Sequence, residues 1–112
     1  MTFEKILVTG ASGQIGSELV SMFSGIFGSD RIVISDIREI KDKRFRYLDV
    51  TDRDAVDLLI SKNKIDTVFH LAAILSAGGE TNPSLAYKVN VDGLHNVLDA
   101  SLKNKVDLVN EA

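Results

Sequence analysis

The sequence predicts an α/β fold, a doubly wound parallel sheet with helices on both faces. Short apolar runs alternate with segments of helical periodicity, which is typical of β-α-β units. The first run leads into residues 10–16, Gly-Ala-Ser-Gly-Gln-Ile-Gly, and this turn opens directly into a helical segment. A second apolar run ends in Asp36, twenty residues after Gly16. With right-handed crossovers, these units give the strand order 3-2-1-4-5, and the switch point where ligands collect lies between strands 1 and 4.

Length and composition indicate one ordinary globular domain over residues 1–112. Hydrophobic residues make up 45% of the chain and charged residues 26%. The net charge of −3 provides no basic patch for nucleic acid or a membrane surface. The absence of cysteine excludes disulfides, thiol catalysis and thiolate metal sites. No signal-peptide pattern and no membrane-spanning apolar run is visible, so we expect a cytoplasmic protein.

Five segments have the character of strands. The first is almost continuously apolar after Lys5, which suits a parallel strand covered on both faces. The third alternates between polar and apolar residues, which fits an edge strand. The expected ranges are 3–9, 31–36, 44–49, 66–73 and, for the beginning of a fifth strand, 106–109.

Three helices are expected between these strands. The first follows the glycine turn and ends at Gly25 and Gly28, and its inward stripe is Ile15, Leu19, Met22, Phe23 and Ile26. The second spans residues 51–63 with Thr51 as a possible cap, and its inward residues are Ala55, Leu58 and Leu59. The third spans residues 82–104 with Asn82 as cap and Pro83 in the first turn, and its inner face carries Leu85, Val89, Leu94, Val97, Leu98 and Ser101.

The glycine turn has the composition of a pyrophosphate site. Gly10 allows the sharp turn, Gly13 allows close approach of a phosphate, and Gly16 allows the helix to pack tightly on the strand. The helix N-terminus then directs its amides and dipole at the anion. Asp36 stands where dinucleotide folds accept hydrogen bonds from the adenosine ribose. The alternative is a glycine turn that only packs a helix on a sheet.

These motifs together resemble the extended short-chain dehydrogenase/reductases, the Rossmann-type family of NAD-dependent sugar-nucleotide epimerases and dehydratases. The matching positions are residues 9–16, Asp36, residues 49–50, His-Leu-Ala-Ala at 70–73, Asn-Val-Asp-Gly at 90–93 and Asn-Val-Leu at 96–98. A finer resemblance, to the short-chain type of L-threonine 3-dehydrogenase, is carried by residues 70–77 together with Gly79-Glu80 and Asn82-Pro83.

The resemblance implies NAD as cofactor and a small-molecule substrate. The cofactor-binding residues that it implies are Gly10, Ser12, Gly13, Gln14, Ile15, Gly16, Asp36, Ile37, Arg38, Asp49, Val50, Leu71, Ala72, Ala73 and Asn90. Asp36 favours NAD over NADP because its carboxylate repels a 2′-phosphate, although Arg38 in principle favours one. Ser76 lies where the substrate-side loop of the family begins, and a plain loop serine is the alternative.

The catalytic Tyr-x-x-x-Lys pair of this family is missing. Tyr47 is followed four residues later by Thr51, and Tyr87 by Val91. We therefore expect no catalytic residue in this chain, a sheet truncated after the start of its fifth strand, and the nucleotide-binding half of a longer enzyme that is inactive alone. An uncovered sheet face favours self-association, and homodimers are common in the family.

No metal site is expected either. His70 lies among apolar residues of a strand and is interpreted as a satisfied core or site-lining histidine, because no second ligand lies at zinc spacing. His95 is expected to be half exposed on a helix.

Three functions remain open at this point. The first is NAD-dependent oxidation of L-threonine to 2-amino-3-ketobutyrate. The second is a sugar-nucleotide epimerase or dehydratase similar to UDP-glucose 4-epimerase. The third is a non-catalytic NAD-binding fragment or sensor, which the missing Tyr-x-x-x-Lys pair supports.

Overall fold

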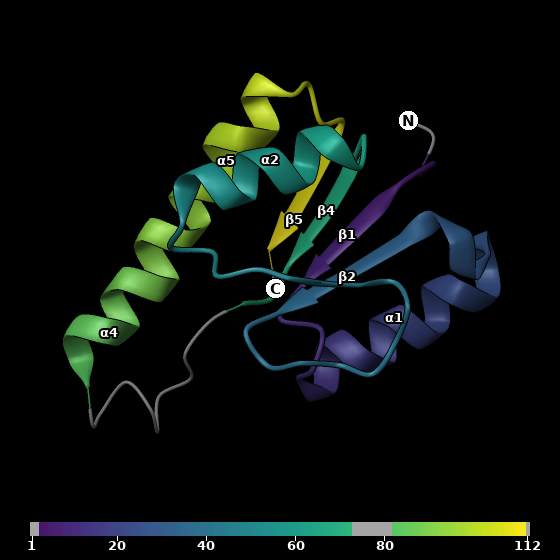
Figure 1. Ribbon diagram of the computed structural model, residues 1–112, viewed down its shortest axis with the longest axis horizontal. Helices are drawn as coiled ribbons and strands as arrows, with labels where there is room; N and C mark the ends of the chain where they lie inside the picture. Colours follow the sequence, from purple (N-terminus) through teal and green to yellow (C-terminus); the bar gives the residue numbers. More distant parts are fainter. Residues whose placement is uncertain (1–2, 73–81, 112) are drawn as a thin grey trace.

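The computed structural model describes residues 3–72 and 82–111, which form a parallel sheet with helices on both faces (Figure 1). The strand order is β3-β2-β1-β4-β5, as the sequence predicts. All neighbouring strands run parallel. The strands are β1 (Ile6–Thr9), β2 (Ile32–Asp36), β3 (Phe45–Tyr47), β4 (Thr67–His70) and β5 (Leu108–Glu111). Strand β5 begins later than expected because the amide of Val106 closes the preceding helix instead, on the carbonyl of Ser101.

The helices divide between the two faces of the sheet. Helix α1 covers one face, and α2 and α5 pack side by side on the other (Figure 1). Their bounds are α1 (Gln14–Phe27), η1 (Ser29–Arg31), α2 (Arg53–Lys62), α4 (Pro83–Tyr87), η2 (Lys88–Asp92) and α5 (Gly93–Lys103), where η1 is a 3-10 turn and η2 a π-helical segment. Among the described residues, no helix combines the length and apolar character that a membrane crossing requires.

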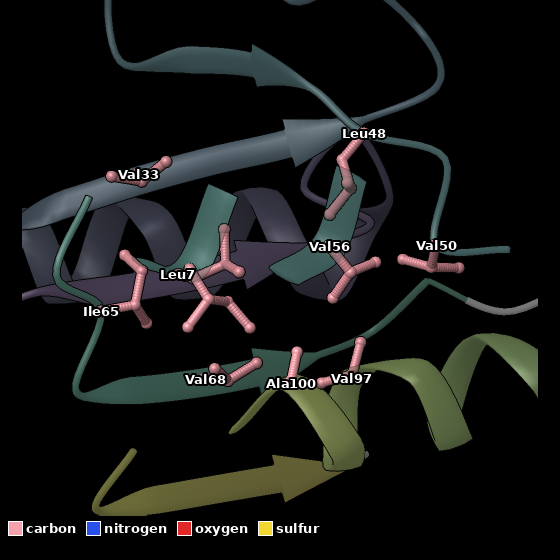
Figure 2. Close-up of a cluster of buried hydrophobic side chains, with 10 residues drawn as sticks. Leu7, Val33, Leu48, Val50, Val56, Ile65, Val68, Val97 and Ala100 are labelled. Atoms are coloured by element: carbon pink, nitrogen blue, oxygen red, sulfur yellow. The ribbon is translucent and has the colours of Figure 1, made fainter. Parts of the chain in front are cut away.

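The larger buried cluster lies between the sheet and the α2–α5 pair. Side chains of β1, β2 and β4 meet those of the two helices there (Figure 2). Its buried members are Leu7, Val33, Leu48, Val50, Val56, Ile60, Ile65, Val68, Val97 and Ala100. Each buried Leu, Ile or Val side chain in the cluster contributes about 1.5–3 kcal/mol relative to its exposed state. This cluster therefore anchors both helices, and with them the loops at the carboxyl edge of the sheet.

The inward stripe expected for α1 is wrong at three positions. Ile15, Met22 and Ile26 are exposed, while Val20 and Phe23 are buried. Gly16 sets the rotation of α1 about its axis. Its backbone lies against Gly10 and Ala11, in the turn that follows β1, so Gly16 faces the sheet. Residues four and seven positions later then share the inner face. Of the two predicted end residues, Gly28 is confirmed, since it ends α1 at a φ of 95°. Gly25 is wrong, because α1 continues past it to Phe27.

The inner faces of the other helices differ from expectation for related reasons. Leu58 of α2 is exposed, and the buried residues are Val56 and Ile60. In the third helical segment Val97 and Ser101 are buried as expected, whereas Leu85 and Leu98 are exposed. The π-helical segment η2 inserts an extra residue into the turn, so that apolar positions before and after it fall on different faces.

The cap of α2 is Asp52 rather than Thr51. The Asp52 carboxylate accepts a hydrogen bond from the amide of Ala55 at 3.1 Å. Thr51 instead donates its hydroxyl to Asp49 at 2.7 Å. The cap predicted for α4 is confirmed, since the Asn82 side chain accepts from the amide of Leu85.

The chain enters β4 and β5 through two copies of one turn. Residues 62–66 read Lys-Asn-Lys-Ile-Asp, and residues 103–107 read Lys-Asn-Lys-Val-Asp. In each copy the Asn ends the helix, and the following Lys64 or Lys105 adopts a left-handed φ of 54° or 55°. The amides that follow bond back to carbonyls of the last helical turn, which is the Schellman arrangement.

Replacing Lys64 by glycine should stabilise the fold. Glycine adopts a left-handed conformation without the Cβ clash, so Lys64→Gly should raise the free energy of unfolding by up to about 1 kcal/mol. The matched control is Lys62→Gly, inside α2, which should lower that free energy by up to about 1 kcal/mol. Urea denaturation followed by circular dichroism measures both, and a destabilised Lys64→Gly variant would contradict this account.

Candidate dinucleotide-binding site

The carboxyl ends of β1, β2 and β4 meet at one edge of the sheet. Strand β1 lies between the other two, so the chain order reverses across it. Open α/β sheets bind ligands at such a switch point. The glycine turn after β1, the loop after β2 and the end of β4 therefore form the candidate site.

The backbone of the glycine turn directly contacts the backbone at the end of β4 and at the start of α1. Gly10 has a φ of 65°, and a Cβ there would lie 2.7 Å from the amide nitrogen of Ala72. A Cβ on Gly16 would lie 2.5 Å from the carbonyl oxygen of Gly10. Both distances are shorter than real Cβ atoms tolerate, so these two positions require glycine for the fold itself.

Gly13 differs from its two neighbours in the motif. A Cβ there would meet only the carbonyl oxygen of Gly10 at 3.5 Å, an ordinary van der Waals contact. Gly13 is also the N-cap of α1, which therefore has no capping side chain, and the first turn of α1 carries no acidic residue. The positive end of the helix dipole is thus uncompensated by side chains, and the open side of Gly13 fits a pyrophosphate.

Asp36 is held in place by the glycine turn and by its own loop. One carboxylate oxygen, Oδ2, accepts the amide of Ser12 at 3.0 Å and its hydroxyl at 2.7 Å. The other, Oδ1, accepts the amide of Arg38 at 3.1 Å. Burial raises the pKa of Asp36, but hydrogen bonds from Ser12, Arg38 and Ile37 outweigh this effect and leave it below its usual value. Asp36 is therefore an anion at neutral pH, and the Ser12 amide points at it.

The loop that follows Asp36 is anchored on α1. Arg44 donates to both oxygens of Asp42, at 2.9 and 2.7 Å, and to the Ser24 hydroxyl at 2.8 Å. These hydrogen bonds to Arg44 lower the pKa of Asp42 to about 2. Ile37 and Arg38, between Asp36 and this anchor, are exposed at the edge of the site.

Sequence reasoning missed Thr9, the last residue of β1. Its Oγ1 accepts the amides of Leu71 and Ala72 at 3.0 and 3.2 Å and lies 2.8 Å from Nδ1 of His70. Because these two amides occupy both lone pairs, the hydroxyl hydrogen must be donated to Nδ1. His70 is therefore the neutral Nε2–H tautomer. The sequence feature that indicates this role is a threonine directly before the glycine turn.

The interpretation of His70 as a satisfied core histidine is confirmed. Its side chain is 4% exposed and hydrogen-bonded to Thr9. Burial lowers the pKa of His70 from its ordinary value of 6.5, and the Glu111 carboxylate on neighbouring β5 partly opposes this shift. His95, by contrast, is more exposed than expected and lies 3.4 Å from Asp99.

The loop expected to flank adenine is fixed against α5. Asp49 Oδ1 accepts the amide and hydroxyl of Thr51 at 2.9 and 2.7 Å, and the Val50 carbonyl accepts Nδ2 of Asn96 at 3.0 Å. The Val50 side chain is 4% exposed and packs in the core, against Gly93. Val50 can therefore contact a ligand only through its main chain.

The remaining expected site residues are distributed as follows. Leu71 and Ala72 are half-buried at the end of β4, beside Gly10. Asn90 lies within η2 and not at the sheet edge itself. Ala73 and Ser76 lie outside the described residues. Within residues 3–72 and 82–111, no three His, Asp or Glu side chains gather as a metal site would need.

Comparison with known proteins decides the family. The profile of the NAD-dependent epimerase/dehydratase family matches residues 6–110. This chain belongs to that family. It is 42% identical over 109 residues to an uncharacterised epimerase/dehydratase of Staphylococcus saprophyticus, covering 92% of this chain and 34% of that protein.

Solved structures of similar proteins have the same fold. The L-threonine dehydrogenase of Phytophthora infestans matches with a TM-score of 0.88 and 46% identity, over 93% of this chain and 34% of that one. The UDP-glucose 4-epimerase of Thermus thermophilus, in complex with NAD, matches with a TM-score of 0.81 and 25% identity, over 94% and 36%. This family member therefore spans about a third of the length of the relatives it matches.

Substitutions should distinguish the glycine of this motif that ligand binding requires from the glycine that the fold requires. Gly13→Ala should leave the free energy of unfolding nearly unchanged and weaken NAD binding at least about tenfold, because the methyl group occupies the approach to the phosphates. Gly16→Ala should instead destabilise the fold by more than about 1 kcal/mol, because its Cβ meets backbone. Thermal unfolding and calorimetric titration of both variants test this, and unchanged NAD affinity in a folded Gly13→Ala variant would contradict it.

His70 should make stability depend on pH. Because burial lowers its folded pKa below the unfolded 6.5, neutral His70 stabilises the fold fully above pH 6.5, and that stabilisation is lost as the pH falls below 6.5. The loss cannot exceed about 1.4 kcal/mol per pH unit for one proton. In the His70→Asn variant, the asparagine carbonyl still accepts the Thr9 hydroxyl. Its free energy of unfolding, measured by urea denaturation, should change less between pH 7 and 5.5 than that of the wild type. A folded His70→Asn variant that retains the wild-type slope would contradict this assignment.

Proposed function

We propose that this chain is the NAD-binding part of an NAD-dependent oxidoreductase that converts L-threonine to 2-amino-3-ketobutyrate. The observation that carries the NAD assignment is the pairing of an open Gly13 with an ionised Asp36 at the switch point of the sheet. The threonine assignment is supported by 46% identity to an L-threonine dehydrogenase, against 25% to a UDP-glucose 4-epimerase.

The proposal gives each group of site residues a task. The N-terminus of α1, with Gly10, Gly13, Gln14, Ile15 and Gly16, holds the pyrophosphate. Asp36 accepts hydrogen bonds from the adenosine ribose, with Ile37 and Arg38 beside it. The Asp49–Val50 loop flanks adenine, Leu71, Ala72 and Ala73 line the nicotinamide side, and Asn90 lies behind its ribose. NAD supplies the hydride acceptor when bound.

The proposed catalysis also needs groups that this chain does not contain. No tyrosine in the sequence is followed four residues later by lysine. A positioned general acid/base contributes about 10²–10⁴-fold to such reactions, and orientation of the substrate contributes more. We therefore infer that the chain alone binds NAD without oxidising threonine, and that Ser76 contacts substrate only in the longer enzyme.

A sugar-nucleotide epimerase or dehydratase is the second candidate, supported by the match to UDP-glucose 4-epimerase. Grafting separates the two. Residues 3–111 replace the corresponding segment of the P. infestans dehydrogenase in one chimera and of the T. thermophilus epimerase in another. Threonine-dependent NADH formation in the first, without UDP-glucose epimerisation in the second, supports the proposal. The reverse result contradicts it, and NAD binding without activity in either favours a non-catalytic role.

We further propose a cytoplasmic protein that self-associates. Large apolar side chains are exposed along α4, η2 and α5, and they are Leu85, Tyr87, Val91, Leu98 and Leu102. Exposed apolar side chains on these consecutive helical segments favour association with a second copy. Analytical ultracentrifugation over a range of concentrations tests it, and a monomer throughout would overturn it.

Asp36 should set the preference between NAD and NADP. A 2′-phosphate placed beside this anion is repelled, so NADP should bind at least about tenfold more weakly than NAD. Asp36→Asn should narrow that ratio by weakening NAD binding, because the neutral amide accepts hydrogen bonds less strongly. Calorimetric titration of the chain with each dinucleotide measures the ratio. Saturable NADP binding equal to that of NAD would contradict the assigned role of Asp36.

A further inference from the structure

The Asp36 carboxylate has little hydrogen-bonding capacity left. An ionised carboxylate offers about four lone-pair positions, two on each oxygen. The amide and hydroxyl of Ser12 occupy both positions on Oδ2, and the amide of Arg38 occupies one on Oδ1. The amide of Ile37 donates to the carboxylate as well, so the free protein already fills these positions. A ribose hydroxyl must therefore displace one of the present donors.

The present donors differ in how easily they can leave. The amides of Ser12, Ile37 and Arg38 belong to the backbone of the glycine turn and of the loop after β2. That backbone is itself fixed, since the amide of Ala11 bonds to the Ser35 carbonyl at 3.1 Å. The Ser12 hydroxyl, in contrast, is on an exposed side chain and leaves Oδ2 by rotation about one bond.

We infer that the Ser12 hydroxyl competes with the ribose hydroxyls for Oδ2 of Asp36. In the free protein it satisfies and orients the carboxylate. When a ribonucleotide binds, the Ser12 hydroxyl rotates away and a ribose hydroxyl takes its position, while the Ser12 amide stays bonded to Oδ2. Ser12 thus sets the affinity of the site for a ribose with free hydroxyls. This inference rests on the proposed NAD-binding function.

Removing the hydroxyl should tighten binding. Ser12→Ala keeps the backbone amide and frees one acceptor position, so NAD should bind about three- to tenfold more tightly, the value of one modest hydrogen bond. Ser12→Thr keeps a hydroxyl at this position, so it should not show the gain. A purely structural role for Ser12 predicts the opposite sign, with weaker binding in Ser12→Ala.

The decisive experiment combines these variants with ligands that carry or lack ribose hydroxyls. ADP and 2′,3′-dideoxy-ADP are titrated by calorimetry into the wild-type chain, Ser12→Ala and Ser12→Thr. The gain in Ser12→Ala should appear with ADP and vanish with 2′,3′-dideoxy-ADP, which has no ribose hydroxyl to take the vacated position on Oδ2. An equal gain for both ligands, no gain, or a loss would overturn the competition.

A second measurement needs no ligand and distinguishes failure of the Ser12–Asp36 contact from failure of the proposed NAD-binding function. The carboxyl carbon of Asp36 is titrated by NMR in the free chain, where Ser12→Ala should raise the pKa of Asp36 and Ser12→Thr should not. An unchanged pKa in Ser12→Ala overturns the contact itself. If the pKa rises as expected but the wild-type chain binds neither NAD nor ADP, the proposed function fails and the competition fails with it.

Discussion

The structure depends on one seam where three backbone segments touch without intervening side chains. The carbonyl oxygen of Gly10 lies against Gly16, and Gly10 itself lies against the end of β4. No side chain fits at either contact. The seam fixes how far α1 stands from the sheet and how it is rotated about its axis. The burial of Val20 and Phe23, and the direction of the helix N-terminus, both follow from that rotation.

The apolar sheet changes to a polar network at its carboxyl edge. Within the sheet, Leu7, Val33 and Val68 pack against the α2–α5 pair. One residue beyond Val8, the Thr9 hydroxyl ties β1 to the first two amides after β4 and to His70. A buried hydroxyl with three satisfied partners holds this edge in one arrangement. The core therefore positions the candidate site directly, without a flexible connection.

The second half of the site is built on the same principle of fixed backbone and few adjustable groups. Asp36 accepts hydrogen bonds from backbone amides, and its loop is anchored by Arg44 on Ser24. A carboxylate held in this way needs little reorganisation when a ligand binds, which lowers the cost of binding. The Ser12 hydroxyl is the adjustable donor in this cluster, which is why its removal is informative.

Sequence by itself determined the elements whose residues have few alternatives. Gly10, Gly13 and Gly16 stand between an apolar run and a helical pattern, where the chain needs particular backbone torsions. A carboxylate ends the next strand, where a dinucleotide site needs an acceptor. The fold and the strand order follow from these features. Tertiary structure alone decided which helix faces are buried. Apolar residues surround α1 on more than one side, so periodicity could not choose between Ile15 and Val20, whereas the Gly16 seam could. The hydrogen bonds of Ser12 and Thr9 were likewise invisible, because each joins residues distant in sequence that meet only when the strands pair.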